Sequence, residues 1–196
     1  MKRAVVIALV AALALSMLAV LAGCGGDANK DEAVQHMNAG DNYYDAVMTA
    51  WTGVEDAQAE IAAKAMEGDM AAFTGEAGEA MIQGFADSFE KVSTDLENAF
   101  NEYEAITGLD GVDDYKEYAE VRMEAIEIWK KMVAAADQLL TDLVGQLATI
   151  EAGKELEFLT QLMESEELAA IGEMADQIET LDDEAEQIKL DKKLEQ

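Results

Sequence analysis

The chain has 196 residues, and its 42 Asp and Glu side chains outnumber 13 Lys and Arg, which leaves a formal net charge of −29. This surplus excludes nucleic acid as a partner, because phosphates would be repelled, and it argues against direct adsorption on anionic lipid headgroups. The chain has no proline, only 6% aromatic residues and much Ala, Leu, Met, Glu and Gln, a composition that favours helices over strands.

The first 23 residues have the layout of an export signal. Lys2 and Arg3 form a positive n-region, and residues 4–22 form an apolar run interrupted by Ser16. A transmembrane helix needs about 20 apolar residues, so hydropathy alone also allows an uncleaved membrane anchor. An ordinary export signal would end with small residues and need no cysteine, but Cys24, the single cysteine of the chain, follows this run closely.

Residues Leu21-Ala22-Gly23-Cys24 resemble the lipobox of bacterial lipoproteins. The resemblance covers residues 1–26 only. It implies that Cys24 is diacylated on sulfur, that the signal is cut before it, and that the protein is lipid-anchored on the extracytoplasmic side of the cell membrane or outer membrane. Two or three acyl chains anchor a protein firmly, because each buried methylene contributes about 0.8 kcal/mol. In that family Gly25, in place of an Asp, mildly favours the outer membrane where there is one.

Removal of residues 1–23 leaves 173 residues, enough for one domain with a sizeable core. No cysteine remains for a disulfide once Cys24 carries the anchor, so this domain must depend on its core. Residues 24–38 are polar and weakly patterned, and we expect them to form a tether behind the acylated cysteine. Residues 39–196 are expected to form an acidic helical bundle.

Four amphipathic stripes follow, with apolar residues three or four positions apart, as in helices that each bury one face. The first contains Tyr44, Val47, Trp51, Val54, Ile61 and Ala65; the second contains Met81, Phe85, Phe89, Val92, Leu96, Ala99, Tyr103 and Ile106. The third contains Tyr115, Tyr118, Ala125, Trp129, Met132, Ala136, Leu139, Leu143, Leu147 and Ile150; the fourth contains Leu156, Leu159, Met163, Ala170, Met174, Ile178, Leu181, Ala185 and Ile188. Arg122 interrupts the third stripe, where Val121 is expected to cover the turn.

Turn signals separate the stripes near residues 68–75, 108–112 and 152–154. Gly108-Leu109-Asp110-Gly111 is the clearest of them, and two aspartates follow it in the next first turn. The last break is ambiguous, because Ser165-Glu166-Glu167 is as good a helix start as Gly153 is a helix end. Antiparallel neighbours bury most when their lengths match, which favours a turn at Gly153 and a kink at Ser165.

These elements predict an all-α fold, an elongated antiparallel four-helix bundle behind an N-terminal lipoprotein signal helix. Helices of 35–40 residues would be about 55 Å long. The alternative is a pair of long helical hairpins that pack loosely or exchange between subunits.

The motifs of known catalytic and metal sites are missing from the sequence. His36 is the only histidine, so the paired Glu-x-x-His motifs of a di-metal bundle cannot be formed, and we place it in the tether or the frayed start of the first helix. Asp110-Gly111-Val112-Asp113-Asp114 lacks the ligand pattern of an EF-hand. We therefore predict no catalytic residue, no cofactor and no metal site, and we expect a protein that is not an enzyme.

Residues 164–186 contain ten acids and no base. They form either a solvated helix face or a docking surface for a basic envelope protein or divalent cations. The first acids to test for a cation site would be Asp182, Asp183, Glu184 and Glu186, although no ligand spacing points to a closed cage.

The first and third expected helices run parallel, and each begins with tyrosines followed by a tryptophan. We expect the rings to gather toward one end, as a core layer or as a pocket for a small apolar ligand; they are Tyr43, Tyr44, Trp51, Tyr115, Tyr118 and Trp129. The sequence thus predicts a lipid-anchored bundle with an interaction or structural role. The alternative is an envelope binding module for a small apolar ligand, a lipid or a divalent cation.

Overall fold

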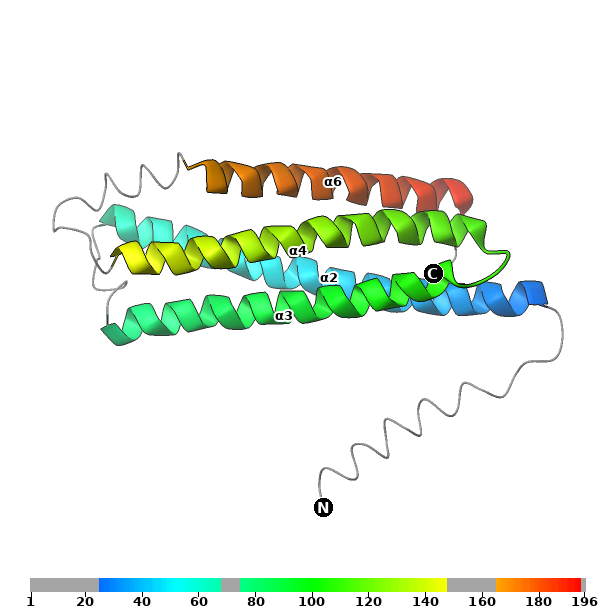
Figure 1. Ribbon diagram of the computed structural model, residues 1–196, viewed down its shortest axis with the longest axis horizontal. Helices are drawn as coiled ribbons and strands as arrows, with labels where there is room; N and C mark the ends of the chain where they lie inside the picture. The colour runs from blue at the N-terminus through cyan, green and yellow to red at the C-terminus, as the bar shows by residue number, and fades with distance from the viewer. Residues whose placement is uncertain (1–24, 68–74, 148–164, 195–196) are drawn as a thin grey trace, which may run out of the picture.

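A computed structural model describes residues 25–67, 75–147 and 165–194 (Figure 1). It contains the helices α2 (Gly25–Glu67), α3 (Gly75–Thr107), α4 (Asp113–Leu147) and α6 (Glu166–Lys192), and no strand occurs among the described residues. The predicted all-α bundle is therefore confirmed. The expected signal in residues 1–23, Cys24 and the expected turn at 152–154 lie outside the described residues.

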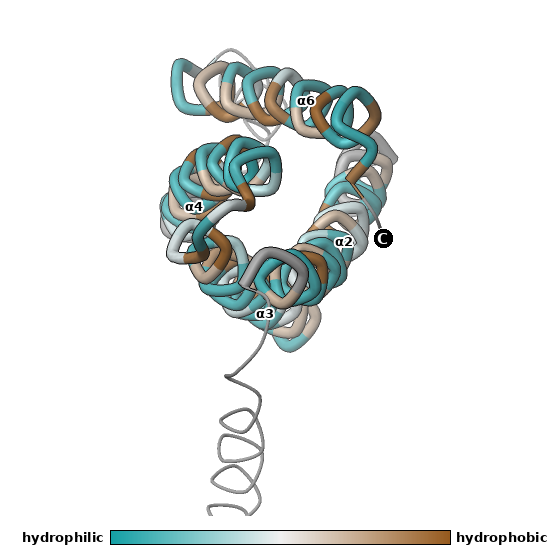
Figure 2. Tube along the Cα trace, turned by 90° about the vertical axis from the view of Figure 1, so that its right-hand side faces the viewer, coloured by the Kyte–Doolittle hydropathy of each residue, from teal (hydrophilic) through white to brown (hydrophobic). Residues whose placement is uncertain are grey.

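The four helices alternate in direction along the chain (Figure 1). Viewed along the bundle, they follow one another around its axis in the order α2, α3, α4, α6 (Figure 2). Close backbone packing joins α2 to α3, α3 to α4 and α4 to α6, whereas α2 and α4 approach at few places. Long side chains, rather than close backbone packing, connect α2 and α6.

Most core residues belong to the predicted stripes, although Ala170 of the fourth stripe is exposed. The core residues outside the stripes are Ala33, Met37, Val112, Ala119, Ile126, Val133 and Leu194. On α3, seven stripe residues are buried, and Met81 packs against them partly buried; the seven are Phe85, Phe89, Val92, Leu96, Ala99, Tyr103 and Ile106. On α4, the stripe from Tyr115 to Ala136 is buried throughout. The periodicity of the sequence therefore identified the buried faces of both helices correctly.

The expectation of a polar tether over residues 24–38 is wrong for the part that the structure describes. α2 begins at Gly25, and Ala33 and Met37 are completely buried in the core. Both extend the first stripe toward the N-terminus at helical spacing. Few apolar side chains occur in these first turns, and most of their neighbours are polar, which is why the sequence pattern looked weak there.

The turn between α3 and α4 was predicted near residues 108–112 and is confirmed. Gly111 has a φ of 75°, a left-handed conformation that glycine adopts without steric cost. Val112 is buried, and its carbonyl accepts hydrogen bonds from the N–H groups of Tyr115 and Lys116 at 3.0 Å. The Asn29 amide of α2 donates to the Asp110 carbonyl at 2.9 Å, so α2 begins beside this turn.

Close contact with α3 fixes one position of α2. A Cβ atom at Gly40 would lie 2.6 Å from Cε1 of Tyr103, closer than real Cβ contacts allow. The tyrosine ring therefore packs directly on the glycine backbone, so α2 and α3 approach closely there.

Ser165 begins α6, so the prediction of a kink in a continuous helix at this residue is wrong. Its backbone is extended, with φ −72° and ψ 147°, and its side chain accepts a hydrogen bond from the Leu168 N–H at 3.2 Å, as an N-cap does. At the other end, Lys193 adopts a left-handed conformation with φ 53°, and Leu194 turns back into the core.

Candidate functional site

A buried arginine lies at the centre of the bundle. Arg122 belongs to the apolar stripe of α4 and is only 7% exposed, whereas Val121 beside it is partly buried. The prediction that Val121 replaces Arg122 in the core is therefore wrong. A charge buried to this extent must be paired and hydrogen-bonded, because its desolvation is otherwise too costly.

The partners of Arg122 come from α6 and from its own helix. Nη1 donates to Oδ1 of Asp182 at 2.6 Å, Nη2 donates to Oε1 of Glu186 at 3.0 Å, and Nε donates to the hydroxyl of Tyr118 at 2.9 Å. The guanidinium carbon also lies 4.8 Å from the centre of the Tyr44 ring and 5.3 Å from that of Tyr118. The arginine thus joins α4 to α6 through charges and stacks on rings from α2 and α4.

Asp41 of α2 connects all four helices. Its Oδ1 accepts hydrogen bonds from the hydroxyls of Tyr103 of α3, at 2.8 Å, and Tyr118 of α4, at 2.6 Å. Its Oδ2 accepts from Nζ of Lys189 of α6 at 2.6 Å. Both oxygens of this carboxylate are therefore used inside the bundle.

Four of the six predicted rings join or contact the network, at mid-length of α2 rather than at one end; they are Tyr44, Trp51, Tyr118 and Trp129. Tyr43 is exposed, so the prediction is wrong for that ring. The Tyr44 hydroxyl donates to Asp182 at 2.8 Å and accepts from Nε1 of Trp129 at 3.0 Å. Trp51 and Trp129 meet edge to face, with ring centroids 5.2 Å apart. The expected position was wrong because α2 begins 14 residues earlier than residue 39.

Burial changes the acid–base properties of this network. It raises the pKa of Tyr44, Tyr103 and Tyr118 above the ordinary value of 10.0, and nearby carboxylates raise it further. Burial also raises the pKa of Asp182, although Tyr44 and Arg122 pull it down. The three hydroxyls therefore stay protonated at neutral pH and act as hydrogen-bond donors that position the charged groups.

A cleft of about 420 Å³ opens onto this network between α2, α4 and α6. Its walls are polar; the lining residues are Asn38, Asp41, Asn42, Tyr44 and Asp45 from α2, Arg122 from α4, and Glu186 and Lys189 from α6. A second hollow of about 410 Å³ lies between α2 and α3 and includes Val54, Met81 and Phe85 among its lining residues.

The four acids named as the first to test for a cation site have different surroundings. Asp182 and Glu186 turn to Arg122, whereas Asp183 and Glu184 are exposed. Within residues 25–67, 75–147 and 165–194, no group of three or more His, Cys, Asp or Glu side chains is arranged to hold a metal ion.

His36 lies inside α2 rather than in a tether, so this expectation is corrected as well. Its Nδ1 is 2.7 Å from Oε2 of Glu102 on α3, and its Nε2 is 3.9 Å from Oε1 of Glu32. The contact joins α2 to α3 near the α3–α4 turn.

Asp41 and Lys189 were not predicted from the sequence as members of the central network. One signal was present, since a charged residue inside an otherwise apolar stripe, such as Arg122, requires partners of opposite charge from facing helices. The sequence contains so many acids that it did not indicate which of them these partners are.

No known family model, curated protein or solved structure matches this chain. Among the described helices, none combines the length and the hydropathy that crossing a bilayer requires.

Proposed function

We propose that this chain is a lipid-anchored, extracytoplasmic helical-bundle protein of the cell envelope that acts by binding a basic partner. Its N-terminal signal helix would be removed, and Cys24 would carry the acyl chains at the cell membrane or outer membrane. The lipobox-like residues 21–24 behind a positive n-region and an apolar run support the anchor. The acidic surface of α6 supports the partner.

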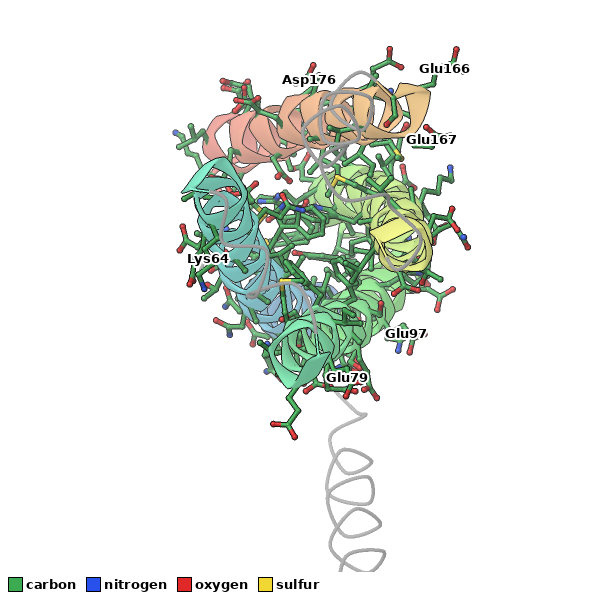
Figure 3. The ribbon with its side chains drawn as sticks, turned by 90° about the vertical axis from the view of Figure 1, so that its left-hand side faces the viewer. Lys64, Glu79, Glu97, Glu166, Glu167 and Asp176 are labelled. Atoms are coloured by element: carbon green, nitrogen blue, oxygen red, sulfur yellow. The ribbon has the colours of Figure 1, made fainter. Side chains whose placement is uncertain are left out.

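The outer face of α6 is the observation that carries this proposal. Every acid between residues 166 and 177 is exposed, and the buried residues of the helix, Ile178, Ala185 and Ile188, all follow this segment. Glu166, Glu167 and Asp176 extend away from the bundle (Figure 3). Their charges are not opposed by any base between residues 166 and 186, so they attract a positively charged surface and steer its approach.

The geometry of the bundle places this face far from the proposed anchor. α2 begins one residue after Cys24, beside the α3–α4 turn and the end of α6, whereas α6 begins at the opposite end (Figure 1). At 1.5 Å per residue, the 43 residues of α2 extend about 65 Å. An anchor at Cys24 would therefore leave the start of α6 accessible to partners beyond the membrane surface.

The anchor is tested by Cys24→Ser in the native host. We expect this variant to lose labelling by a fatty-acid probe, to retain its signal and to change its fractionation with membranes. If it labels and fractionates like the wild type, the lipobox interpretation is wrong.

The partner is tested by crosslinking of the acylated protein in native envelopes, followed by identification of the captured proteins. The variant Glu173→Lys/Asp176→Lys reverses two exposed charges of α6, and Glu79→Lys/Glu97→Lys makes the same change on α3. We expect a basic protein to be captured by the wild type and the α3 variant but lost from the α6 variant. Equal capture by both variants would show that the α6 face is only a solvated surface.

A second candidate is a binding module for a small apolar ligand. The hollow between α2 and α3 favours it, since Val54, Met81 and Phe85 present apolar surface there. A fluorescent apolar probe that binds the wild type, but not a variant with Gly84→Leu in this hollow, would support this candidate.

A further inference from the structure

We infer that the polar cleft between α2, α4 and α6 binds a small zwitterion, a molecule such as a free α-amino acid that carries a carboxylate and an ammonium group. This inference goes beyond the proposed docking of a basic partner on the outer face of α6, because it concerns a different surface. The hydrogen-bonding groups that the network leaves unused, their arrangement and the charge balance of the cleft support it.

The inner wall of the cleft offers unused N–H donors. A guanidinium has five N–H groups, and Arg122 uses three of them, for Tyr118, Asp182 and Glu186. The other two have no acceptor among the described residues, although Arg122 is 7% exposed. An arginine fork of this kind suits a carboxylate.

Lys189 adds to this inner wall. Its ammonium group has three N–H donors and uses one for Asp41, and its side chain is 11% exposed. Two cationic groups that are already held in place by carboxylates therefore face the same cleft. A ligand carboxylate would complete their hydrogen bonding without breaking the existing ion pairs.

The outer part of the cleft offers unused acceptors instead. The side chains of Asn42 and Asp45 are exposed and have no hydrogen-bond partner among the residues that the structure describes. Glu186 uses only Oε1 for Arg122, which leaves Oε2 available. These oxygens suit an ammonium group, so donors and acceptors are separated along the depth of the cleft.

The charge of the surroundings selects between ligand classes. A simple anion would be repelled by Asp41, Asp45 and Glu186 at the cleft and by the net charge of −29 of the whole chain. A simple cation would bring its charge toward Arg122 and Lys189. A zwitterion has no net charge and matches both walls, and a cleft of about 420 Å³ is within the size range of small-molecule sites.

The test is calorimetric titration of the protein, purified in detergent from its native envelope, with individual L-amino acids. Each amino acid that binds is then compared with the amine that lacks its carboxylate and with the acid that lacks its ammonium group. We expect both analogues to bind at least about tenfold more weakly, a difference of about 1.4 kcal/mol. Equal binding of either analogue, or no binding by any of the amino acids, would overturn the inference.

Asp45→Asn is the variant that probes the ammonium contact. The fold should tolerate it, because the side chain is exposed and has no partner among the described residues. We expect affinity for the bound amino acid to fall about tenfold, since a charge-assisted hydrogen bond is lost. Asp56→Asn, an exposed aspartate of α2 that does not line the cleft, is the matched control and should bind like the wild type. Equal affinities of the two variants would contradict the proposed contact between Asp45 and the ligand ammonium group.

Arg122→Lys probes the carboxylate contact. It keeps the charge but loses the planar fork, so we expect weaker binding of the amino acid. The α6 variant Glu173→Lys/Asp176→Lys should bind the amino acid unchanged, since neither residue lines the cleft. If the cleft does not bind amino acids, the proposed docking of a basic partner on α6 is unaffected. If docking on α6 is not observed, the proposed amino-acid site in the cleft is unaffected.

Discussion

α3 and α6 are held in the same bundle by different forces. α3 contributes an uninterrupted apolar stripe, with Val92, Leu96 and Ala99 fully buried at its centre. α6 buries only Ile178, Ala185 and Ile188 within its length, and its docking adds charged contacts to Arg122, Asp41, Asp114 and Glu117. Burial of apolar area stabilises α3 without requiring a particular side chain as its neighbour. Each charged contact of α6, in contrast, requires one particular partner of opposite charge.

This difference changes how each helix should respond to substitution. An apolar contact weakens in proportion to the area and volume that are removed. A buried ion pair behaves otherwise, because removal of one partner leaves the other charge desolvated and unpaired. The polar connection of α6 should therefore be sensitive to single changes and to pH, and the apolar connection of α3 should respond to volume alone.

The largest effect is expected for Arg122→Ala. It leaves Asp182 and Glu186 without their partner, and loss of one member of a buried pair costs about 3–5 kcal/mol of unfolding free energy. Urea unfolding followed by circular dichroism measures this loss, with exposed Lys131→Ala on the same helix as the control. The double variant Arg122→Ala/Asp182→Asn should lose less than the sum of the single changes, because the orphaned charge is then absent. A loss below about 1 kcal/mol for Arg122→Ala would mean that α6 does not depend on this arginine.

Leu96→Ala should cost about 3 kcal/mol, within the range for a leucine truncated in a core. Leu96 is completely buried on α3, and its apolar contacts do not depend on the protonation of any group. The loss should be the same at every pH at which the protein stays folded, as measured by urea unfolding of variant and wild type in parallel. A strong pH dependence would show that the apolar and polar parts of the bundle are coupled.

A smaller effect is expected for Tyr103→Phe. This change removes one hydrogen bond to Asp41, which keeps Tyr118 and Lys189 as partners, so about 1 kcal/mol should be lost. Tyr43→Phe, at an exposed position of α2, should leave the thermal midpoint unchanged. Equal midpoints for the two variants would contradict a structural role for the Tyr103 hydroxyl.

The smallest effect is expected in how the free energy of unfolding varies with pH. Burial raises the pKa of Asp182 above its ordinary 3.8, so the folded state holds a proton there more tightly than the unfolded state. The stability that this group adds is fully present below pH 3.8 and is lost as pH rises through the raised pKa. Relative to Asp182→Asn, the wild type should therefore gain stability as pH falls from about 7 toward 4. A difference between them that is constant with pH would contradict the raised pKa.

The comparison also explains what the sequence could and could not predict. Within the described residues, the helical stripes, the helix directions and the buried faces of α3 and α4 follow from periodicity, because apolar stripes and glycine turns are local features. Gly111 and the acids after it, for example, define the α3–α4 turn by themselves. Prediction failed in the first turns of α2, where Ala33 and Met37 are the buried residues among polar neighbours.

The partners within the central network could not be predicted from the sequence, for a different reason. Arg122 stood out in its stripe, but its partners lie 60 and 64 positions away on α6, and Asp41 and Lys189 are separated by 148 positions. In a chain with 42 acids, sequence alone offers too many candidates for each base. Which carboxylate faces which cation depends on the rotation of each helix, and that is fixed only by the assembled core.

The close contact between Gly40 and Tyr103 sets that assembly in register. Sliding α3 by one turn, about 5.4 Å, would move the tyrosine ring off the glycine and against side chains that have a Cβ atom. It would also take the Tyr103 hydroxyl away from Asp41, which would leave that carboxylate with Tyr118 and Lys189 as its hydrogen-bond donors. The missing side chain at Gly40 therefore fixes the position of α3 along α2. The same Asp41 carboxylate that accepts from Tyr103 also accepts from Lys189, so α6 is joined to this position through two hydrogen bonds.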